Sequence, residues 1–167
     1  MYDAMLAETV TIRGDGDDEI EAYLARPMSP GPRGGVVVIH HMPGYDTPTK
    51  EITRTFAVHG YNAIMPNLYH RVAPGASPDD AAAAARAQGG VPDRQLVADV
   101  AGAAAYLRGL TSANGKVGVI GYCSGDGYWS SAPNRPSSGQ DRSLVRCTRG
   151  PTFSGMPSGG APTTNAP

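Results

Sequence analysis

The sequence predicts an α/β protein whose sheet is mostly parallel and is preceded by an N-terminal hairpin. Residues 36–39 are four consecutive β-branched residues, as in a strand that is buried on both faces. Residues 116–122 contain a second apolar segment of strand length, and helical patterns fill the chain between the two. Strands that alternate with helices in this way pair in parallel through right-handed crossovers.

The predicted hairpin joins residues 9–13 to residues 20–24. Apolar and polar residues alternate in both segments, so that Val10 and Ile12 share one face of the first strand. The acidic residues 15–18 between them are typical of a hairpin turn. A calcium loop needs a different spacing and a bidentate Glu at its end, which this stretch lacks. The sequence therefore predicts a turn here and no metal site.

A first helix is expected after the loop formed by residues 40–46. Thr47 is a suitable N-terminal cap, with Pro48 at the first helical position. Gly60 supplies the signal that ends this helix. Residues 61–65 follow as a short strand that Pro66 closes.

Two more helices are expected before the last strand. Ser77 caps the first of them, and the alanines at 81–85 favour helix by their intrinsic propensity. Pro92 opens the second helix. Its apolar residues form one stripe at helical spacing, made of Leu96, Val97, Val100, Ala103, Ala104 and Leu107.

The character of the chain changes after residue 125. Residues 126–167 contain 6 Pro, 6 Gly, 7 Ser and 4 Thr, and neither strand nor helix periodicity persists there. Such a segment cannot bury enough apolar surface to offset about 1–2 kcal/mol of backbone entropy per residue. We therefore expect one α/β domain at 1–125 and a Pro/Gly/Ser-rich tail at 126–167 that is disordered or loosely attached.

The composition excludes several classes of function. The 14 Lys and Arg against 15 Asp and Glu give a net charge of −1, which removes the basic face that nucleic-acid binding needs. No apolar run reaches the roughly 18 residues of a membrane span, and the N-terminus lacks the pattern of a secretory signal. Cys123 and Cys147 make no disulfide framework, so a cytoplasmic location is expected.

The strongest chemical motif follows the last predicted strand. Residues 121–125 have the pattern G-x-C-x-G, the thiol form of the nucleophile elbow, in which a sharp turn raises the nucleophile above the sheet. Glycines flank the turn because side chains there would clash. The N–H of Ser124 then points toward a developing oxyanion. The alternative is that Cys123 is a small buried residue that closes the strand.

Three segments resemble the dienelactone hydrolase (carboxymethylenebutenolidase) family. Residues 115–125 are similar to its nucleophile region, and residues 60–71 to the strand that its members usually write as G-Y-x-A-x-x-P-x-L-Y-x-R. Residues 36–40, followed by Gly44, resemble its third strand and oxyanion loop. The resemblance covers about residues 8–125.

The resemblance implies an α/β-hydrolase fold, incomplete here, that cleaves a small lactone or ester with a Cys-His-Asp triad and no cofactor. Cys123 is then the nucleophile. The backbone N–H groups of Ser124 and of the residue near Met42 would form the oxyanion hole. The expected partner is a small-molecule ester or lactone, with no role for nucleic acid or membrane.

His41 stands where family members typically have a Glu near the resting cysteine. Together with Tyr122, it is a candidate for the substrate pocket. In one interpretation the imidazole of His41 helps to ionise the thiol, whose free pKa is about 8.5. In the other, His40 and His41 are loop residues that form local hydrogen bonds.

The triad Asp and His of the family follow the nucleophile, and this chain departs from that pattern. Its last histidine is His70, and its only acids after the motif are Asp126 and Asp141. The similarity stops abruptly at Gly125, which suggests a truncated product, a change of coding frame near codon 126, or a divergent native tail. We therefore expect weak or no turnover. The alternative is a truncated remnant without enzymatic activity.

Overall fold

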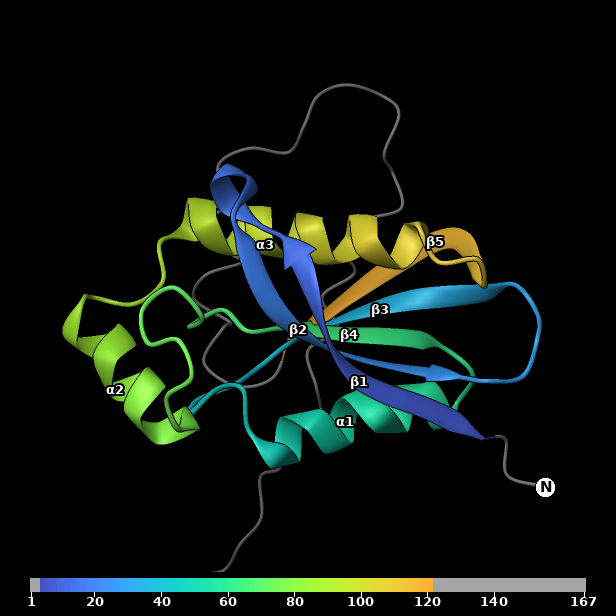
Figure 1. Cartoon of the computed structure of the whole chain (residues 1–167), viewed down its shortest axis with the longest axis horizontal. Coiled ribbons are helices and arrows are strands. Elements are labelled where there is room, and N and C mark those ends of the chain that lie inside the picture. The colour runs from blue at the N-terminus through green and yellow to red at the C-terminus, as the bar shows by residue number, and fades with distance from the viewer. Residues whose placement is uncertain (1–3, 122–167) are drawn as a thin grey trace, which may run out of the picture.

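The computed structural model describes residues 4–121, and all structural statements below refer to this part of the chain. It contains one sheet and three α-helices (Figure 1). The strands are β1 (Met5–Arg13), β2 (Glu19–Pro27), β3 (Arg33–Ile39), β4 (Asn62–Pro66) and β5 (Ala113–Gly121). The helices are α1 (Thr47–Val58), α2 (Pro78–Ala87) and α3 (Asp93–Arg108), with a short 3₁₀ turn η1 (Asp15–Asp17) in the hairpin. The expected domain end at residue 125 and the tail 126–167 lie outside the described residues.

The five strands form one mixed sheet in the order β1-β2-β4-β3-β5. The N-terminal hairpin is confirmed, since β1 and β2 pair antiparallel along their whole length. β3 pairs in parallel with both β4 and β5, as the β-branched run at 36–39 predicts. β2 adds to β4 in the antiparallel direction, so the sheet is mixed rather than mostly parallel. The hairpin is thus an integral edge of the sheet, not an appendage before it.

The helices cover the sheet on both faces (Figure 1). α1 packs on β2 and β4 from one side, and α3 packs on β3, β4 and β5 from the other. Within the α3 stripe, Val100, Ala103, Ala104 and Leu107 are buried, whereas Val97 is 49% exposed. Leu96 is half-buried and packs against the same core cluster, so the stripe prediction is right for these five positions and wrong for Val97.

The helix starts follow the expected cap chemistry with one shift. Ser77 accepts a hydrogen bond from the N–H of Asp80 at 3.3 Å and caps α2, as predicted. α1 is capped by Asp46 instead of Thr47, because the Asp46 carboxylate accepts from the N–H of Thr49 at 2.8 Å. Thr47 is the first helical residue. Both residue types are good caps, so the pattern alone left the start uncertain by one residue.

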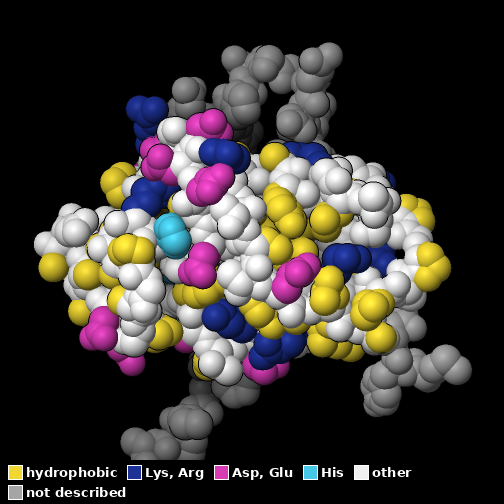
Figure 2. Space-filling view, in the orientation of Figure 1, with side chains coloured by type: hydrophobic (Ala, Val, Ile, Leu, Met, Phe, Trp, Pro, Cys, Tyr) yellow, Lys and Arg dark blue, Asp and Glu magenta, His cyan; other side chains and the backbone are white. Residues whose placement is uncertain are grey.

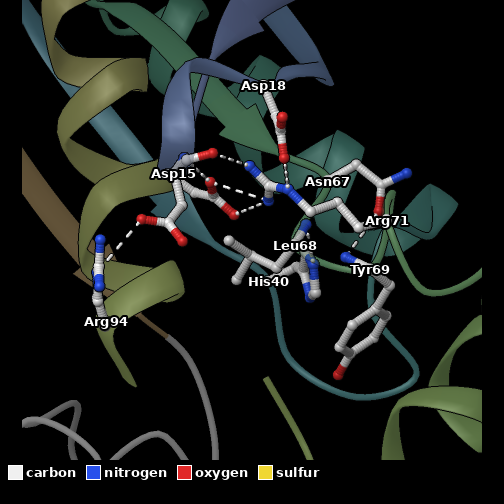
Figure 3. Close-up of polar contacts among 9 residues, drawn as sticks. Asp15, Asp18, His40, Asn67, Leu68, Tyr69, Arg71 and Arg94 are labelled. Atoms are coloured by element: carbon white, nitrogen blue, oxygen red, sulfur yellow. Dashed lines mark hydrogen bonds and ion pairs between the residues drawn. The ribbon is translucent and has the colours of Figure 1, made fainter. Parts of the chain in front are cut away.

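A network of charged groups ties the hairpin turn to α3 (Figure 3). The guanidinium of Arg71 donates to both carboxylate oxygens of the fully buried Asp99, at 2.9 and 3.1 Å, and to Asp18 at 2.9 Å. The N–H of Asp15 donates to Asp99 at 2.8 Å. Burial opposes the charge of Arg71, but its hydrogen bonds to Asp99 and Asp18 outweigh that effect and raise its pKa. Arg71 therefore bridges the hairpin turn, through Asp18, to Asp99 of α3.

Close packing accompanies this network. A Cβ atom on Gly102 of α3 would lie 1.7 Å from the backbone oxygen of Arg13, so the helix and the hairpin touch through backbone there. Figure 2 shows acidic and basic side chains gathered together over the turn between β1 and β2.

None of the described helices combines the length and apolar character that a membrane crossing requires.

Candidate functional site

The carboxyl ends of β3 and β5 define the candidate site. Ile39, the last residue of β3, pairs with Gly121, the last residue of β5, in parallel register. The loop of residues 40–46 therefore begins beside the strand end that leads into the G-x-C-x-G motif. Tyr122, Cys123 and Ser124 lie outside the described residues, so their roles stay predictions. His41 and Met42 are described, and both lie in this loop.

His40 is a structural part of the loop. Its ring is buried, with its centroid 4.8 Å from that of Tyr69 in an edge-on arrangement. Nε2 accepts from the N–H of Leu68 at 3.2 Å, so the ring proton resides on Nδ1, which lies 3.2 Å from the carbonyl oxygen of His41. Burial lowers the pKa of His40 to about 4. Because both ring nitrogens are hydrogen-bonded within the protein, neutral His40 is not available as a general acid or base at neutral pH.

His41 is held by the first turn of α1. Its Nδ1 lies 3.0 Å from the hydroxyl oxygen of Thr49, which is fully buried, and its Nε2 lies 3.8 Å from the carboxylate of Asp46. With the proton on Nε2 facing that carboxylate, Nδ1 accepts from the Thr49 hydroxyl. The lone pair of the imidazole is then already engaged. This geometry favours a local hydrogen-bonding role for His41 over the interpretation in which it ionises the thiol.

Asp46 has two tasks in this arrangement. One carboxylate oxygen caps α1 through the N–H of Thr49, and the other faces His41. Partial burial acts to raise the pKa of Asp46, but the hydrogen bonds from Thr49 and the positive charge that His41 carries when protonated outweigh it and lower the pKa. A carboxylate that stays ionised fixes both the helix start and the orientation of the histidine.

Met42, the candidate oxyanion-hole residue, packs against the larger core cluster. A guanidinium nitrogen of Arg86, on α2, lies 3.9 Å from its sulfur. Gly44 shapes the other end of the loop with φ of +120°, and a Cβ there would come within 2.6 Å of the ring of Tyr69. Only glycine fits this position without moving Tyr69. The loop that carries the Met42 amide is thus fixed by contacts on both sides.

Sequence reasoning missed three residues that shape this site. Asp46 and Thr49 have the spacing of a cap and its third helical residue. This signal is present in the sequence, but the cap was predicted at Thr47. Arg86 is contributed by α2, far along the chain, and no pattern in the sequence predicts its approach to Met42. Among residues 4–121, no group of three or more His, Cys, Asp or Glu side chains is arranged to hold a metal ion.

Comparison with known proteins places these features in a family. The model of the dienelactone hydrolase family matches residues 20–133. The chain is 34% identical over 127 residues to the carboxymethylenebutenolidase of Pseudomonas sp. (strain P51), covering 72% of this chain and 52% of that protein. The chain thus spans about half the length of the curated relatives it matches.

Solved structures agree with the family match. A protein from Klebsiella pneumoniae subsp. pneumoniae, provisionally assigned as a dienelactone hydrolase, superposes with a TM-score of 0.61 at 26% identity, over 72% of this chain and 50% of its own. A dienelactone hydrolase-like promiscuous phosphotriesterase from metagenomic libraries gives a TM-score of 0.54, also at 26% identity and with the same coverage. The chain therefore belongs to the dienelactone hydrolase family.

Proposed function

We propose that this chain carries the nucleophile-bearing part of a dienelactone hydrolase, with Cys123 as the nucleophile that attacks a small lactone or ester. The observation that carries the proposal is the pairing of Ile39 with Gly121. This pairing starts the loop of residues 40–46 next to the strand end from which the G-x-C-x-G motif continues. In this proposal residues 1–125 are an incomplete α/β-hydrolase domain, and residues 126–167 are a tail without a catalytic role.

The proposed reaction has two steps. The thiolate of Cys123 attacks the carbonyl carbon, a C–S bond forms, and the C–O bond to the alcohol or enol oxygen breaks, which gives a thioester. Water then attacks the thioester, releases the carboxylic acid and returns the thiol. The N–H groups of Ser124 and Met42 would stabilise the oxyanion, and one such donor is typically worth about 10²–10³ in rate. This chemistry calls for no cofactor.

Turnover by this chain is expected to be weak. The sequence has no histidine after His70, and the lone pair of His41 is engaged by Thr49. A thiol with a pKa of about 8.5 and no base beside it is mostly protonated at neutral pH. Acylation of Cys123 by a reactive ester then remains feasible, whereas rapid hydrolysis of the thioester does not. The alternative function is a truncated remnant in which even acylation fails.

The substrate class follows from the name of the relative and from one cation. A carboxymethylenebutenolidase is named for a lactone with a carboxymethylene group, which is an anion at neutral pH. Arg86 brings a guanidinium next to Met42, the candidate oxyanion-hole residue. We therefore assign Arg86 as the group that favours anionic over neutral esters at this site.

A burst experiment tests the proposal. The full chain is mixed with p-nitrophenyl acetate at pH 8.5, and the released nitrophenol and the mass of the protein are followed together. We expect about one equivalent of rapid release and an acetyl group on Cys123. Cys123→Ala abolishes both, while the matched control Cys147→Ala leaves both intact. Equal acetylation of the two cysteines, or none at Cys123, would instead support the inactive remnant.

A further inference from the structure

Tyr69 lies between the two ends of the loop that carries Met42. At the start of the loop, the ring of His40 lies edge-on to the ring of Tyr69, with 4.8 Å between the two centroids. At its end, Gly44 approaches the same ring so closely that a Cβ there would lie 2.6 Å from one ring carbon and 2.9 Å from another. In Figure 3 the loop runs past the ring of Tyr69. Both ends of the loop therefore rest on one aromatic side chain.

The two ends of the loop also lie against each other. A Cβ on Gly44 would come within 3.3 Å of Cε1 of His40, so these two residues and Tyr69 form one compact cluster. Only residues 41–43 connect the anchored ends, and Met42 is the middle one. Within the described part of the chain, no backbone carbonyl accepts a hydrogen bond from the N–H of Met42. The direction of this N–H therefore depends on how the ends of the loop are held.

Tyr69 is itself held from both sides. Just before it, the N–H of Asn67 donates to the carbonyl oxygen of Glu21 in β2 at 2.8 Å, and the side chain of Asn67 accepts from the N–H of Tyr69 at 3.2 Å. Just after it, Arg71 donates to the carboxylate of Asp99 in α3 at 2.9 and 3.1 Å. The backbone that carries the ring of Tyr69 is thus joined to both the sheet and a helix.

Leu68 adds a direct hydrogen bond from this backbone to the loop. Its N–H donates to Nε2 of His40 at 3.2 Å, and its side chain is buried in the core. This bond fixes the rotation of the His40 ring that Tyr69 contacts. The L-Y-x-R pattern at residues 68–71 can now be explained by structure. Leu68 orients His40, Tyr69 supports both ends of the loop, and Arg71 joins the segment to α3.

We propose that Tyr69 is a positioning residue for the oxyanion hole, because its ring sets the direction of the Met42 N–H. The inference rests on the proposed function, in which this N–H stabilises the oxyanion that forms when Cys123 attacks an ester. Such a donor must lie about 2.7–3.1 Å from the oxyanion. A displacement of about 1 Å can cost about 10²-fold in rate. Tyr69 acts through the backbone of the loop and is assigned no contact with the substrate.

Two substitutions test whether the ring of Tyr69 has this role. Tyr69→Leu keeps an apolar side chain but removes the ring that His40 and Gly44 contact, whereas Tyr69→Phe keeps the ring. In the full chain, we expect Tyr69→Leu to slow the acylation of Cys123 by p-nitrophenyl acetate about tenfold to a hundredfold. Tyr69→Phe should retain most of the parent rate. A Tyr69→Phe variant as slow as Tyr69→Leu would contradict the proposal.

Alkylation of the same cysteine distinguishes positioning from general damage. The thiolate displaces iodide from iodoacetamide, a C–S bond forms as the C–I bond breaks, and no oxyanion appears. The N–H of Met42 therefore has no part in this reaction. In Tyr69→Leu, the ratio of the acylation rate to the alkylation rate should fall about as far as the acylation rate itself. Equal slowing of both reactions would overturn the proposal, since it would show a change in the thiol or in the fold.

Tyr61→Leu is the matched control. Tyr61 lies immediately before β4, whereas Tyr69 lies beyond the opposite end of that strand. The side chain of Tyr61 is 44% exposed, and its ring lies edge-on to that of Phe56. We expect Tyr61→Leu to leave both reaction rates at the parent values. A rate ratio that falls as far in Tyr61→Leu as in Tyr69→Leu would refute a specific role for Tyr69.

A second variant decides the question if Tyr69→Leu fails to fold. Gly44→Ala pushes the loop away from the same ring, and it should lower the ratio of acylation to alkylation in the same way. Gly31→Ala is its control, because nothing lies within 4 Å of the added Cβ and the positive φ is shared. Equal ratios in the two alanine variants would count against the proposal.

Amide hydrogen exchange tests the loop without relying on Cys123. The N–H of Leu68, which bonds to His40, should exchange about tenfold faster in Tyr69→Leu than in the parent chain. The amides of β3 should keep their parent rates. If the parent chain is not acylated at Cys123, the proposed function fails, whereas the exchange result still decides whether Tyr69 holds the loop. Unchanged exchange at Leu68 would refute that role.

Discussion

The hydroxyl of Thr49 lies 3.0 Å from Nδ1 of His41 and anchors the loop after β3 to the first turn of α1. Thr49 is fully buried, and its backbone N–H donates to Asp46 at the same time. One residue thus couples the helix cap to the histidine beside the candidate oxyanion-hole residue. Replacing the Thr49 hydroxyl therefore changes the surroundings of His41 without altering a residue that contacts the substrate.

Thr49→Val keeps the shape of this side chain and removes the hydroxyl. We expect the free energy of unfolding to fall by about 1 kcal/mol, the net value of one hydrogen bond, because water reaches part of His41 and replaces the lost partner. Urea unfolding measures the change. Thr49→Ser restores the hydroxyl and should recover most of the loss. Equal losses in the two variants would mean that packing of the methyl group, and not the hydrogen bond, explains the effect.

Arg71→Met leaves the buried carboxylate of Asp99 without its cationic partner. We expect a loss of about 3 kcal/mol in the free energy of unfolding, since an unpaired buried charge is strongly destabilising. Arg94→Met is the matched control, because the Arg94 side chain is 90% exposed and lies 3.7 Å from Asp15. Its effect should stay within about 0.5 kcal/mol. Similar losses for both variants in a urea titration would contradict a special role for the buried pair.

The free energy of unfolding should decline as the pH falls, because His40 is protonated more readily in the unfolded chain. Burial lowers its pKa from 6.5 to about 4 in the folded protein, so the unfolded chain binds the proton more tightly. The contribution of neutral His40 to the free energy of unfolding is therefore complete above pH 6.5. It is lost between about pH 6.5 and 4, on the order of 3 kcal/mol in total. Unfolding measured from pH 7.5 to 4 should show this slope.

His40→Gln removes the titrating group and should flatten the pH dependence in that window, although it lowers stability at neutral pH. His59→Gln is the control, because His59 lies exposed at the end of α1 and its Nδ1 lies 2.8 Å from the carbonyl oxygen of Thr55 in the same helix. It should keep the slope of the parent chain. A slope that persists after His40→Gln would assign the pH effect to other groups.

Gly44→Ala should be more harmful than Gly31→Ala, although both glycines have a positive φ, +120° and +134°. The backbone strain of about 1–3 kcal/mol is common to both. Only at Gly44 does the added methyl group meet the ring of Tyr69, whereas nothing lies within 4 Å at Gly31. Thermal melts should show an additional loss of about 1–3 kcal/mol at Gly44. Equal effects would show that the loop adapts to the methyl group at little cost.

Arg86→Ala should slow the acylation of Cys123 by an ester that carries a carboxylate. We expect a loss of about tenfold in the second-order rate constant, as for one charge-assisted hydrogen bond. The rate with a neutral ester of equal reactivity should change little. Arg108→Ala, at the far end of α3, serves as the charge-matched control. Equal slowing for both esters would remove Arg86 from substrate selection.

The strands and helix starts could be predicted because they depend on local patterns. The β-branched run before His40, the cap at Ser77 and the acidic hairpin turn each signal their structure within a few residues. The antiparallel addition of β2 to β4 and the pairing of Arg71 with Asp99 could not be predicted in this way. These contacts join distant segments, and no periodicity in the sequence records them.

The candidate site, too, could be predicted only in part from the sequence. The loop of residues 40–46 and Met42 were placed by resemblance to the family, and the structure describes how that loop is held. The partners of His41 were missed because the cap was assigned one residue too late, at Thr47 instead of Asp46. A shift of one residue at a helix start is a small error for the fold. Here it conceals the Asp46 carboxylate, which caps the helix and faces the histidine.

The hydrogen bond from Asp15 to Asp99 spans 84 residues. A ribosome adds about 5–20 residues per second, so the first hairpin waits roughly 4–17 s for the helix whose Asp99 accepts a hydrogen bond from its turn. During that interval the nascent hairpin has no completed sheet to join, since β3 and β4 emerge between these two residues. We therefore expect the hairpin turn to reach its final position only after α3 has emerged, and a pause in translation before Asp93 would prolong the time in which the turn lacks this contact.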